Sequence, residues 1–287
     1  MIEIAIGIIA YNEEKNLPKL LDIIKDLKIK ELFLFSDGST DKTNNIIMNF
    51  KGKKTNNVYK IIGKKRRGKY FRINQFIEKT TCDILLLCNG DILPKEGFLK
   101  KIIKFMQDKT IAIITTRGVC VNKKDSLLNQ AVHVYWELHH EFSLIQPKGT
   151  GLLALRKERI KLPKTSVDEI YLISLLEKKG RIKYADNITY YTKSPEKLSE
   201  FVKQIRRYHN GHKIVAKKTN FKDITLNYVQ SIKIIFNYLT HNTNKILLFF
   251  MLLCIEMLGR ILANFDYFFK EEQPVWDVAE STKNLKI

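Results

Sequence analysis

The sequence CDILLLCNGD at residues 82–91 decides the fold that we predict for this chain. Residues 84–87 are all apolar without polar alternation, which is typical of a strand buried on both faces of a parallel sheet. The run ends at Asn89-Gly90-Asp91, and Pro94 opposes a simple continuation of the strand. Ligands of open α/β sheets bind at such carboxyl ends of strands.

The side chains of Asn89 and Asp91 are candidate ligands of a metal ion. They lie two residues apart at this strand end, and carboxylate and carbonyl oxygens are the ligands that Mg²⁺ or Mn²⁺ favours. Mg²⁺ commonly takes only one or two protein ligands and completes its shell with substrate phosphates. The alternative interpretation of this stretch is an ordinary Asn-Gly turn.

Strands and helices alternate on both sides of this stretch. Apolar runs at 2–10 and 32–35 predict two more strands, and each is followed by a polar turn and a helical pattern. This alternation predicts an α/β fold with a mainly parallel sheet and right-handed crossovers. The other predicted elements are helices at 17–27, 43–50, 70–79, 98–106, 170–179 and 195–209 and strands at 59–62 and 111–115.

The composition limits the classes of partner and compartment. The chain has 287 residues, an ordinary apolar fraction and a net charge of +20, so it is not a disordered chain. The charge favours nucleotide phosphates, anionic lipid headgroups or nucleic acid as partners, although a lysine-rich composition alone explains it equally. Four scattered cysteines without C-x-x-C spacing predict reduced, buried thiols, and residues 2–10 already form a strand rather than a signal peptide. Both observations indicate a cytoplasmic protein.

Further candidate residues occupy polar turns. Asp37 follows a predicted strand and can accept hydrogen bonds from a ribose hydroxyl or a base N–H, or form a plain Asx turn. Lys69 ends a basic run and can hold a diphosphate, or belong to a solvated basic face. Asp168 and Glu169 begin a helix, where acids are favourable structurally and where either can serve as a general base. We interpret His139 and His140 as structural or surface histidines.

The order of these motifs resembles that of the family-2 glycosyltransferases over about residues 2–210. This resemblance implies a GT-A fold, which is a mixed, mainly parallel sheet flanked by helices. It also implies a nucleoside-diphosphate sugar donor (a UDP- or GDP-sugar), a divalent metal ion and inversion at the anomeric carbon. The matching motifs are Tyr11-Asn12-Glu13, Asp37-Gly38-Ser39-Thr40-Asp41, Gly68-Lys69 with Asn74, Asn89-Gly90-Asp91, Asp168-Glu169 and Gln204-Ile205-Arg206-Arg207-Tyr208.

The resemblance assigns donor-binding roles in the first half of the chain. It implies that Tyr11, Glu13 and Asp37 border the nucleoside and that Lys69 contacts the phosphates. Asn89 and Asp91 would then take the places of the D-x-D motif. Asn89 stands where the family has its first aspartate, which removes one formal charge from the metal site.

The resemblance assigns the catalytic and acceptor-binding roles in the second half. Asp168-Glu169 falls on the T-E-D triplet that supplies the base, with the acidic order inverted, so either residue can be the base. Gln204, Arg207 and Tyr208 fall on Q-x-x-R-W, a motif of membrane-bound polymerising synthases, with tyrosine in place of tryptophan. The three side chains lie at i, i+3 and i+4 and can form one acceptor-binding wall of a helix.

The C-terminal part lies beyond the resemblance and predicts helices at 222–240 and 245–269. Its uninterrupted apolar run covers only 246–255, shorter than the about 20 residues of a membrane span. Glu256, Arg260 and Asn264 recur every four residues and form a polar stripe. We therefore expect a helix that lies on an anionic membrane surface or packs on its neighbour, with a single tilted span as the alternative.

These observations predict a nucleotide-sugar-binding half at 1–115, an acceptor-binding half at 116–215 and a helical tail at 216–287. The expected function is metal-dependent, inverting transfer of a sugar to a hydroxyl of a glycan or lipid-linked acceptor, at the cytoplasmic face of the membrane. One alternative is a polyprenyl-phosphate sugar synthase, whose acceptor is already anionic. The other is a basic protein that binds polyanions or nucleic acid; we expect no nucleic-acid partner, because aromatic residues interleaved with basic ones are sparse.

Overall fold

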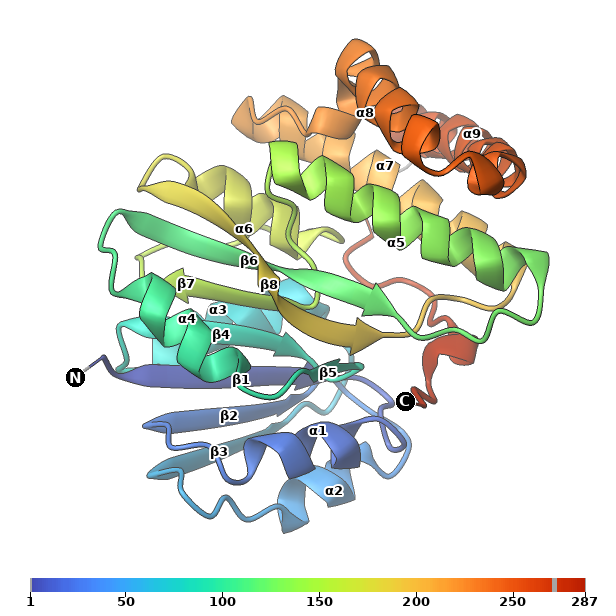
Figure 1. The fold of residues 1–287 in the computed structure, drawn as a ribbon. Helices are drawn as coiled ribbons and strands as arrows, with labels where there is room; N and C mark the ends of the chain where they lie inside the picture. Colours follow the sequence, from blue (N-terminus) through green and yellow to red (C-terminus); the bar gives the residue numbers. More distant parts are fainter. Residues whose placement is uncertain (1, 270–272, 287) are drawn as a thin grey trace.

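A mixed sheet runs through the computed structural model, which describes residues 2–269 and 273–286 (Figure 1). Within these residues the sheet has eight strands in the order β3-β2-β1-β4-β7-β6-β8-β5. The strands are β1 (Ile4–Ala10), β2 (Glu31–Ser36), β3 (Asn57–Ile62), β4 (Ile84–Asn89), β5 (Ile92–Pro94), β6 (Ile111–Cys120), β7 (Leu152–Arg156) and β8 (Arg181–Thr192).

The first four strands of that order are parallel, and this places their carboxyl ends at one edge. β1 pairs in parallel with β2 and β4, and β2 pairs in parallel with β3. β7 runs antiparallel between β4 and β6, and the short β5 pairs antiparallel with β8. The predicted α/β fold with a mixed sheet is therefore confirmed.

Two hydrophobic cores cover the two faces of the sheet. Ile6 and Ile8 of β1 enter one core, and Ala5 and Ile9 enter the other. Such two-sided burial explains the continuous apolar runs of β1 and β4, because neither face meets water. α1 (Leu17–Ile24), α2 (Thr43–Asn49) and α4 (Phe98–Met106) cover the first face, and α3 (Lys69–Lys79) and α6 (Asp168–Leu176) cover the second.

A third core joins four further helices into a separate layer, seen at the top of Figure 1. These helices are α5 (Leu127–Ile145), α7 (Leu198–Thr219), α8 (Tyr228–His241) and α9 (Ile246–Phe269). α9 packs closely on α7, because Gly259 leaves room for Ile205 and Ala263 is fully buried. Arg206 and Asp266 form an ion pair between the same two helices, and His209 and Glu256 lie 2.7 Å apart.

The helix within Thr243–Phe269 is long and apolar enough to cross a membrane, with a mean hydropathy of 2.3. Only 28% of its most apolar window is buried. One face of α9 carries the contacts to α7, and the opposite face is exposed and apolar. Of the predicted tail at 216–287, positions 270–272 and 287 lie outside the described residues, as does position 1 of the predicted first half.

Several elements differ from the sequence-based predictions. α5 and β8 were not predicted, α7 continues to Thr219, and β6 continues to Cys120. The prediction of four buried cysteines is wrong for Cys254, which is exposed on α9, whereas the other three are buried. One face of α9 is exposed although it is apolar, so the apolar surroundings of Cys254 in the sequence do not imply that it is buried.

Candidate active site

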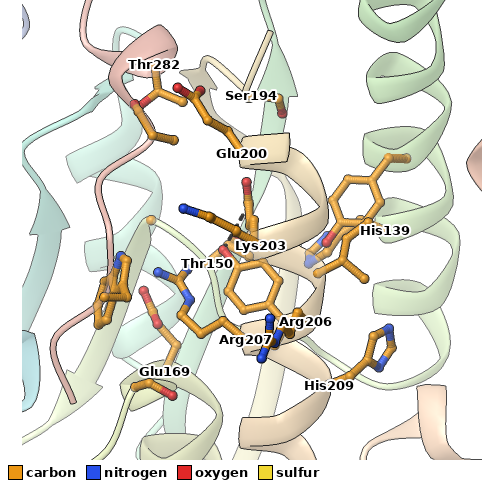
Figure 2. Close-up of a pocket in the computed structure, with 18 of the residues that line it drawn as sticks. His139, Thr150, Glu169, Ser194, Glu200, Lys203, Arg206, Arg207, His209 and Thr282 are labelled. Carbon is orange, nitrogen blue, oxygen red and sulfur yellow. Dashed lines mark hydrogen bonds between the residues drawn. The ribbon is translucent and has the colours of Figure 1, made fainter. Parts of the chain in front are cut away.

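A cavity of about 1160 Å³ opens between the carboxyl edge of the sheet and the helical layer. Its walls come from the ends of β1, β2 and β4, the loop before α3, the first turn of α6, and helices α5 and α7. Figure 2 labels His139 of α5, Glu169 of α6 and Arg207 of α7 among the residues that line it. Every residue to which the sequence analysis gave a donor-binding, metal-binding, catalytic or acceptor-binding role lines this cavity. These residues are Tyr11, Glu13, Asp37, Lys69, Asn89, Asp91, Asp168, Glu169, Gln204, Arg207 and Tyr208.

The turn after β1 is tied to the turn after β2. Asn12 adopts a left-handed conformation (φ 52°), which asparagine tolerates better than most residues, and its side-chain oxygen accepts a hydrogen bond from the Thr40 amide at 2.9 Å. The amide of Glu13 donates to Thr43 Oγ1 at 2.7 Å. Burial raises the pKa of the Glu13 carboxyl to about 7, and the nearby Asp91 charge adds to this effect.

Asp37 organises the basic loop that precedes α3. Its carboxylate accepts hydrogen bonds from the Gly68 amide at 2.8 Å and from the Arg67 amide at 3.2 Å, and it forms an ion pair with Arg72 at 2.8 Å. Gly38 allows the loop to come this close, because a Cβ there would collide with the backbone of residues 65 and 66. Asp37 thus has a structural role in fixing this loop, in addition to its predicted contact with a nucleoside.

Lys69 connects the loop to the two predicted catalytic carboxylates. Its ammonium lies 2.8 Å from Asp168 Oδ2 and donates a hydrogen bond to Glu169. Burial, together with the Glu169 charge, raises the pKa of Asp168 to about 6. Burial acts in the same direction on Glu169, but the ion pair with Lys69 outweighs it and lowers the pKa of that carboxyl. The Asp168 side chain is 2% exposed and that of Glu169 is 21% exposed, so Glu169 is the more accessible carboxylate.

Asn89 and Asp91 provide oxygen ligands at the end of β4. Within the described residues, no hydrogen bond or ion pair engages the Asp91 carboxylate or the Asn89 side chain, and both line the cavity. The described chain holds no group of three or more His, Cys, Asp or Glu residues that could bind a metal ion. The available donor set, one carboxylate and one amide oxygen, fits a divalent cation that takes its other ligands from substrate phosphates and water.

Gln204, Arg207 and Tyr208 form one wall of the cavity, as their spacing predicted. Gln204 Nε2 donates to the Tyr208 hydroxyl at 3.1 Å, and the Arg207 guanidinium lies 4.7 Å from the centre of the Tyr208 ring. Figure 2 shows Arg207 and Glu169 next to each other, and the Arg207 charge helps to lower the pKa of Glu169. The predicted acceptor wall therefore lies beside the more accessible carboxylate.

Residues of the C-terminal segment also reach the cavity, although their role was not predicted from the sequence. Trp276 and Lys283 line it, and no motif marks them. Lys283 Nζ donates to the carbonyl oxygen of Tyr11 at 2.8 Å and forms an ion pair with Glu13. His139, interpreted as a structural histidine, also lines the cavity; burial and the Lys148 charge lower its pKa to about 3, so it is neutral.

The chain is similar in sequence to known proteins. The sequence model of glycosyl transferase family 2 matches residues 5–157. An uncharacterized protein of Methanocaldococcus jannaschii is 30% identical over 103 residues, which is 34% of this chain. The chain spans 44% of the length of that curated relative.

Solved structures of glycosyltransferases are similar over much of the chain. The mannosyltransferase PcManGT from Pyrobaculum calidifontis, in complex with GDP-Man and Mn²⁺, superimposes with a TM-score of 0.70 at 15% identity, covering 94% of this chain and 88% of that one. Glucosyl-3-phosphoglycerate synthase from Mycobacterium tuberculosis, with Mg²⁺ and UDP, gives 0.55 at 17% identity, covering 77% and 80%. S. aureus TarS with UDP-GlcNAc gives 0.52 at 16% identity, covering 78% and 69%. At these identities the likeness shows a shared fold.

Proposed function

The chain belongs to glycosyl transferase family 2 and has the GT-A fold, and on this basis we propose that it is a metal-dependent inverting glycosyltransferase. It would transfer a sugar from a nucleoside-diphosphate sugar to a hydroxyl group of a glycan or lipid-linked acceptor. One observation carries this proposal: the ionised, accessible Glu169 lies in the same cavity as the free oxygens of Asn89 and Asp91 and the wall formed by α7. The solved structures that share the fold were determined with GDP-Man, UDP or UDP-GlcNAc.

The proposed chemistry is a single displacement with Glu169 as general base. Glu169 accepts the proton of the acceptor hydroxyl while the acceptor oxygen forms a bond to the anomeric carbon. The bond between that carbon and the diphosphate oxygen breaks on the opposite face, and the leaving group takes the electron pair, so the configuration inverts. A divalent cation at Asn89 and Asp91 would neutralise the charge that develops on this leaving group. Asp168 holds Lys69 in place and is too buried to meet the acceptor.

The helical layer supports a lipid-linked acceptor on an anionic membrane surface. Val229, Ile232 and Phe236 of α8 are 68%, 67% and 70% exposed, and α9 presents further exposed apolar side chains beside them. Ile232 and Met257 also line the cavity, so the cavity continues to this apolar face. An acceptor anchored in a bilayer that contacts the apolar face of α8 and α9 would enter the cavity at the end near Ile232 and Met257. The net charge of +20 favours a bilayer that contains anionic lipids.

A polyprenyl phosphate is a second candidate acceptor, since cationic side chains that can contact a phosphate line the cavity. Arg207 and Arg260 line the cavity, and Lys69 is engaged with both carboxylates. An anionic phosphate oxygen can attack without a general base. Asp168→Asn together with Glu169→Gln distinguishes the two acceptors: a double variant that keeps the wild-type rate favours the phosphate. Family membership favours either enzyme over the polyanion-binding or nucleic-acid-binding protein that charge alone suggested.

A donor screen tests the proposed function. Calorimetry and donor hydrolysis would be measured for UDP- and GDP-sugars, each with Mn²⁺, Mg²⁺ or a chelator. We expect one nucleotide sugar to bind and to be hydrolysed slowly in a metal-dependent manner. Absence of binding by every nucleotide sugar in the presence of metal would contradict the proposal.

A further inference from the structure

The C-terminal segment, residues 273–286, lies at the carboxyl edge of the sheet although it follows α9 in the sequence. In Figure 1 this red segment runs from the helical layer to the ends of the strands beside β5. At the edge strand, Arg66 Nη1 donates to the carbonyl oxygen of Trp276 at 2.7 Å. At the central strand, Lys283 binds the turn after β1, and the Leu285 amide donates to Asn16 Oδ1 at 2.7 Å. Between these points Lys203 of α7 pairs with Asp277 at 2.9 Å.

These contacts fix the C-terminal segment to the rest of the protein. Leu285 is fully buried and belongs to the core under β1. Asn16 and Glu13, which receive the segment, are themselves buried. Detaching the segment would expose an apolar side chain and leave the buried carboxylate of Glu13 without its cation, and both changes are unfavourable. The segment therefore stays in place as a wall of the cavity.

Trp276 belongs to a cluster of flat side chains that line the cavity. Arg66 lies 4.0 Å from the centre of the Tyr11 ring and 5.8 Å from that of Trp276. Arg207 lies 4.1 Å from the centre of the Trp276 ring and 4.7 Å from that of Tyr208. Such cation–π contacts hold the indole between the turn after β1 and helix α7.

The backbone contacts of Trp276 place it on the donor side of this cluster. Its carbonyl is bound by Arg66, whose neighbours Arg67 and Gly68 donate their amides to Asp37. Pro274 lies against the same loop, with its carbonyl oxygen 2.8 Å from the position that a Cβ of Gly68 would occupy. The segment thus packs on the loop that is fixed by Asp37, one of the residues expected to border the nucleoside.

We propose that Trp276 is a donor-binding residue that offers its ring as a stacking surface to the nucleobase, so that the C-terminal segment completes the nucleoside site. This inference rests on the proposed function. Its physical basis is that every nucleobase has an aromatic face, and stacking on an indole is favourable whichever base is present. Lys283 and Leu285 fix the segment, and Arg66 and Arg207 set the position of the indole.

Fluorescence and calorimetry together test the proposal. The chain has two tryptophans, so Trp136→Phe leaves Trp276 as the sole indole reporter. Trp136 also lines the cavity and donates a hydrogen bond to Ser194 Oγ at 2.7 Å. The quenching in Trp136→Phe is therefore compared with the nucleotide affinity of that same variant. We expect UDP or GDP to quench Trp276 saturably. In the otherwise wild-type chain, Trp276→Ala should weaken UDP or GDP binding about 5- to 150-fold, and Trp276→Phe should restore most of the affinity.

Each other outcome has a definite meaning. Unchanged nucleotide affinity in Trp276→Ala, with no quenching of Trp276 by a nucleotide that binds, would overturn the proposal. Tighter binding in Trp276→Ala would also overturn it, because the segment would then be a cover that must leave. A loss confined to the nucleotide sugar, with UDP and GDP unaffected, would place the ring at the sugar and not at the base. Failure of the wild-type chain to bind any nucleotide would instead refute the proposed function itself.

Discussion

The ammonium of Lys69 lies 2.8 Å from the carboxylate of Asp168, and the same ammonium donates a hydrogen bond to Glu169. The basic loop and the first turn of α6 are therefore held together by one cation between two carboxylates. Two adjacent carboxylates in a buried place repel each other unless a counter-ion is present. The resemblance assigned Lys69 to the donor phosphates, and the structure shows that Lys69 also pairs with the two predicted catalytic carboxylates.

Replacement of Lys69 should therefore affect stability as well as activity. We expect Lys69→Met to lower the free energy of unfolding by about 3–5 kcal/mol, because it leaves a buried acidic pair without its cation. Lys69→Arg retains the charge and should lose much less. Urea denaturation followed by circular dichroism measures both variants. A Lys69→Met protein as stable as the wild type would show that this ion pair contributes nothing to the fold.

The two carboxylates should respond differently to neutral substitution. Glu169→Gln should reduce kcat about 10²- to 10⁴-fold while nucleotide affinity stays constant, because it removes a general base and no donor contact. Asp168→Asn should reduce kcat less, because the Asp168 side chain is only 2% exposed and is paired with Lys69. Steady-state kinetics gives kcat for each of the two variants, and calorimetry gives their nucleotide affinity. The reverse order of effects would assign the base to Asp168.

The two oxygen ligands after β4 should set the metal requirement. Asp91→Ala removes the free carboxylate and should abolish metal-dependent transfer. Asn89→Asp adds a second carboxylate and should preserve or tighten Mn²⁺ binding, because carboxylate oxygens are preferred by hard cations. Mn²⁺ titration monitored by electron paramagnetic resonance gives the affinity without relying on turnover. Wild-type activity of Asp91→Ala in the presence of a chelator would exclude a metal at this place.

The sequence reveals those parts of the site that lie at strand ends. Asp37, Asn89 and Asp91 each follow an apolar run, and parallel strands bring their carboxyl ends to one edge, so local pattern alone predicts that they meet. Asp168 and Glu169 required the family resemblance to connect them to that edge. The helix that carries them begins after an irregular stretch without a repeating pattern.

Other features depend on tertiary packing that has no local signature. α5 is buried at Asn129, Val132, Leu138 and Phe142, because it packs against both the sheet and the other helices, so it has no clean apolar stripe. Pairing along β8 shifts register between its partners Thr116 and Arg117 of β6, which breaks the two-residue alternation of an ordinary strand.

The residues of the C-terminal segment that line the cavity also have no signature in the sequence. The ion pair of Lys283 with Glu13 joins residues 270 positions apart. Neither the spacing nor the composition around residues 276–283 distinguishes them from a polar tail. Such a contact depends on the tertiary fold, in which residues 273–286 lie at the carboxyl edge of the sheet.

The buried Glu13 should leave a signature in the pH dependence of stability. Its folded pKa of about 7 lies above the ordinary value of 4.5, so the folded state binds a proton that the unfolded state has released between these values. Its stabilising contribution is therefore complete below pH 4.5 and is lost as the pH rises through about 7. Glu13→Gln should flatten this decline. Thermal denaturation across this range in the presence of a chelator compares the two proteins, and parallel curves would contradict the assignment.

The exposed apolar face of α8 and α9 should govern attachment to membranes. Deletion of the whole tail is a poor test, because it would also remove Trp276, Lys283 and the buried Leu285. Replacing Val229 and Phe236 by serine leaves the core intact, since both side chains are largely exposed. We expect this double variant to bind vesicles of phosphatidylcholine and phosphatidylglycerol at least about tenfold more weakly, because each side chain would otherwise be buried among acyl chains.

A matched control separates this face from general surface hydrophobicity. Met48 is also an exposed apolar residue, but it lies on α2, away from the helical layer in Figure 1. Met48→Ser should leave vesicle binding unchanged, and neither variant should alter nucleotide affinity or thermal stability. Vesicle cosedimentation at two salt concentrations distinguishes apolar insertion from attraction of the basic surface. If the double variant binds as the wild type does and salt alone releases it, the membrane contact belongs to the lysine-rich surface and not to α8 and α9.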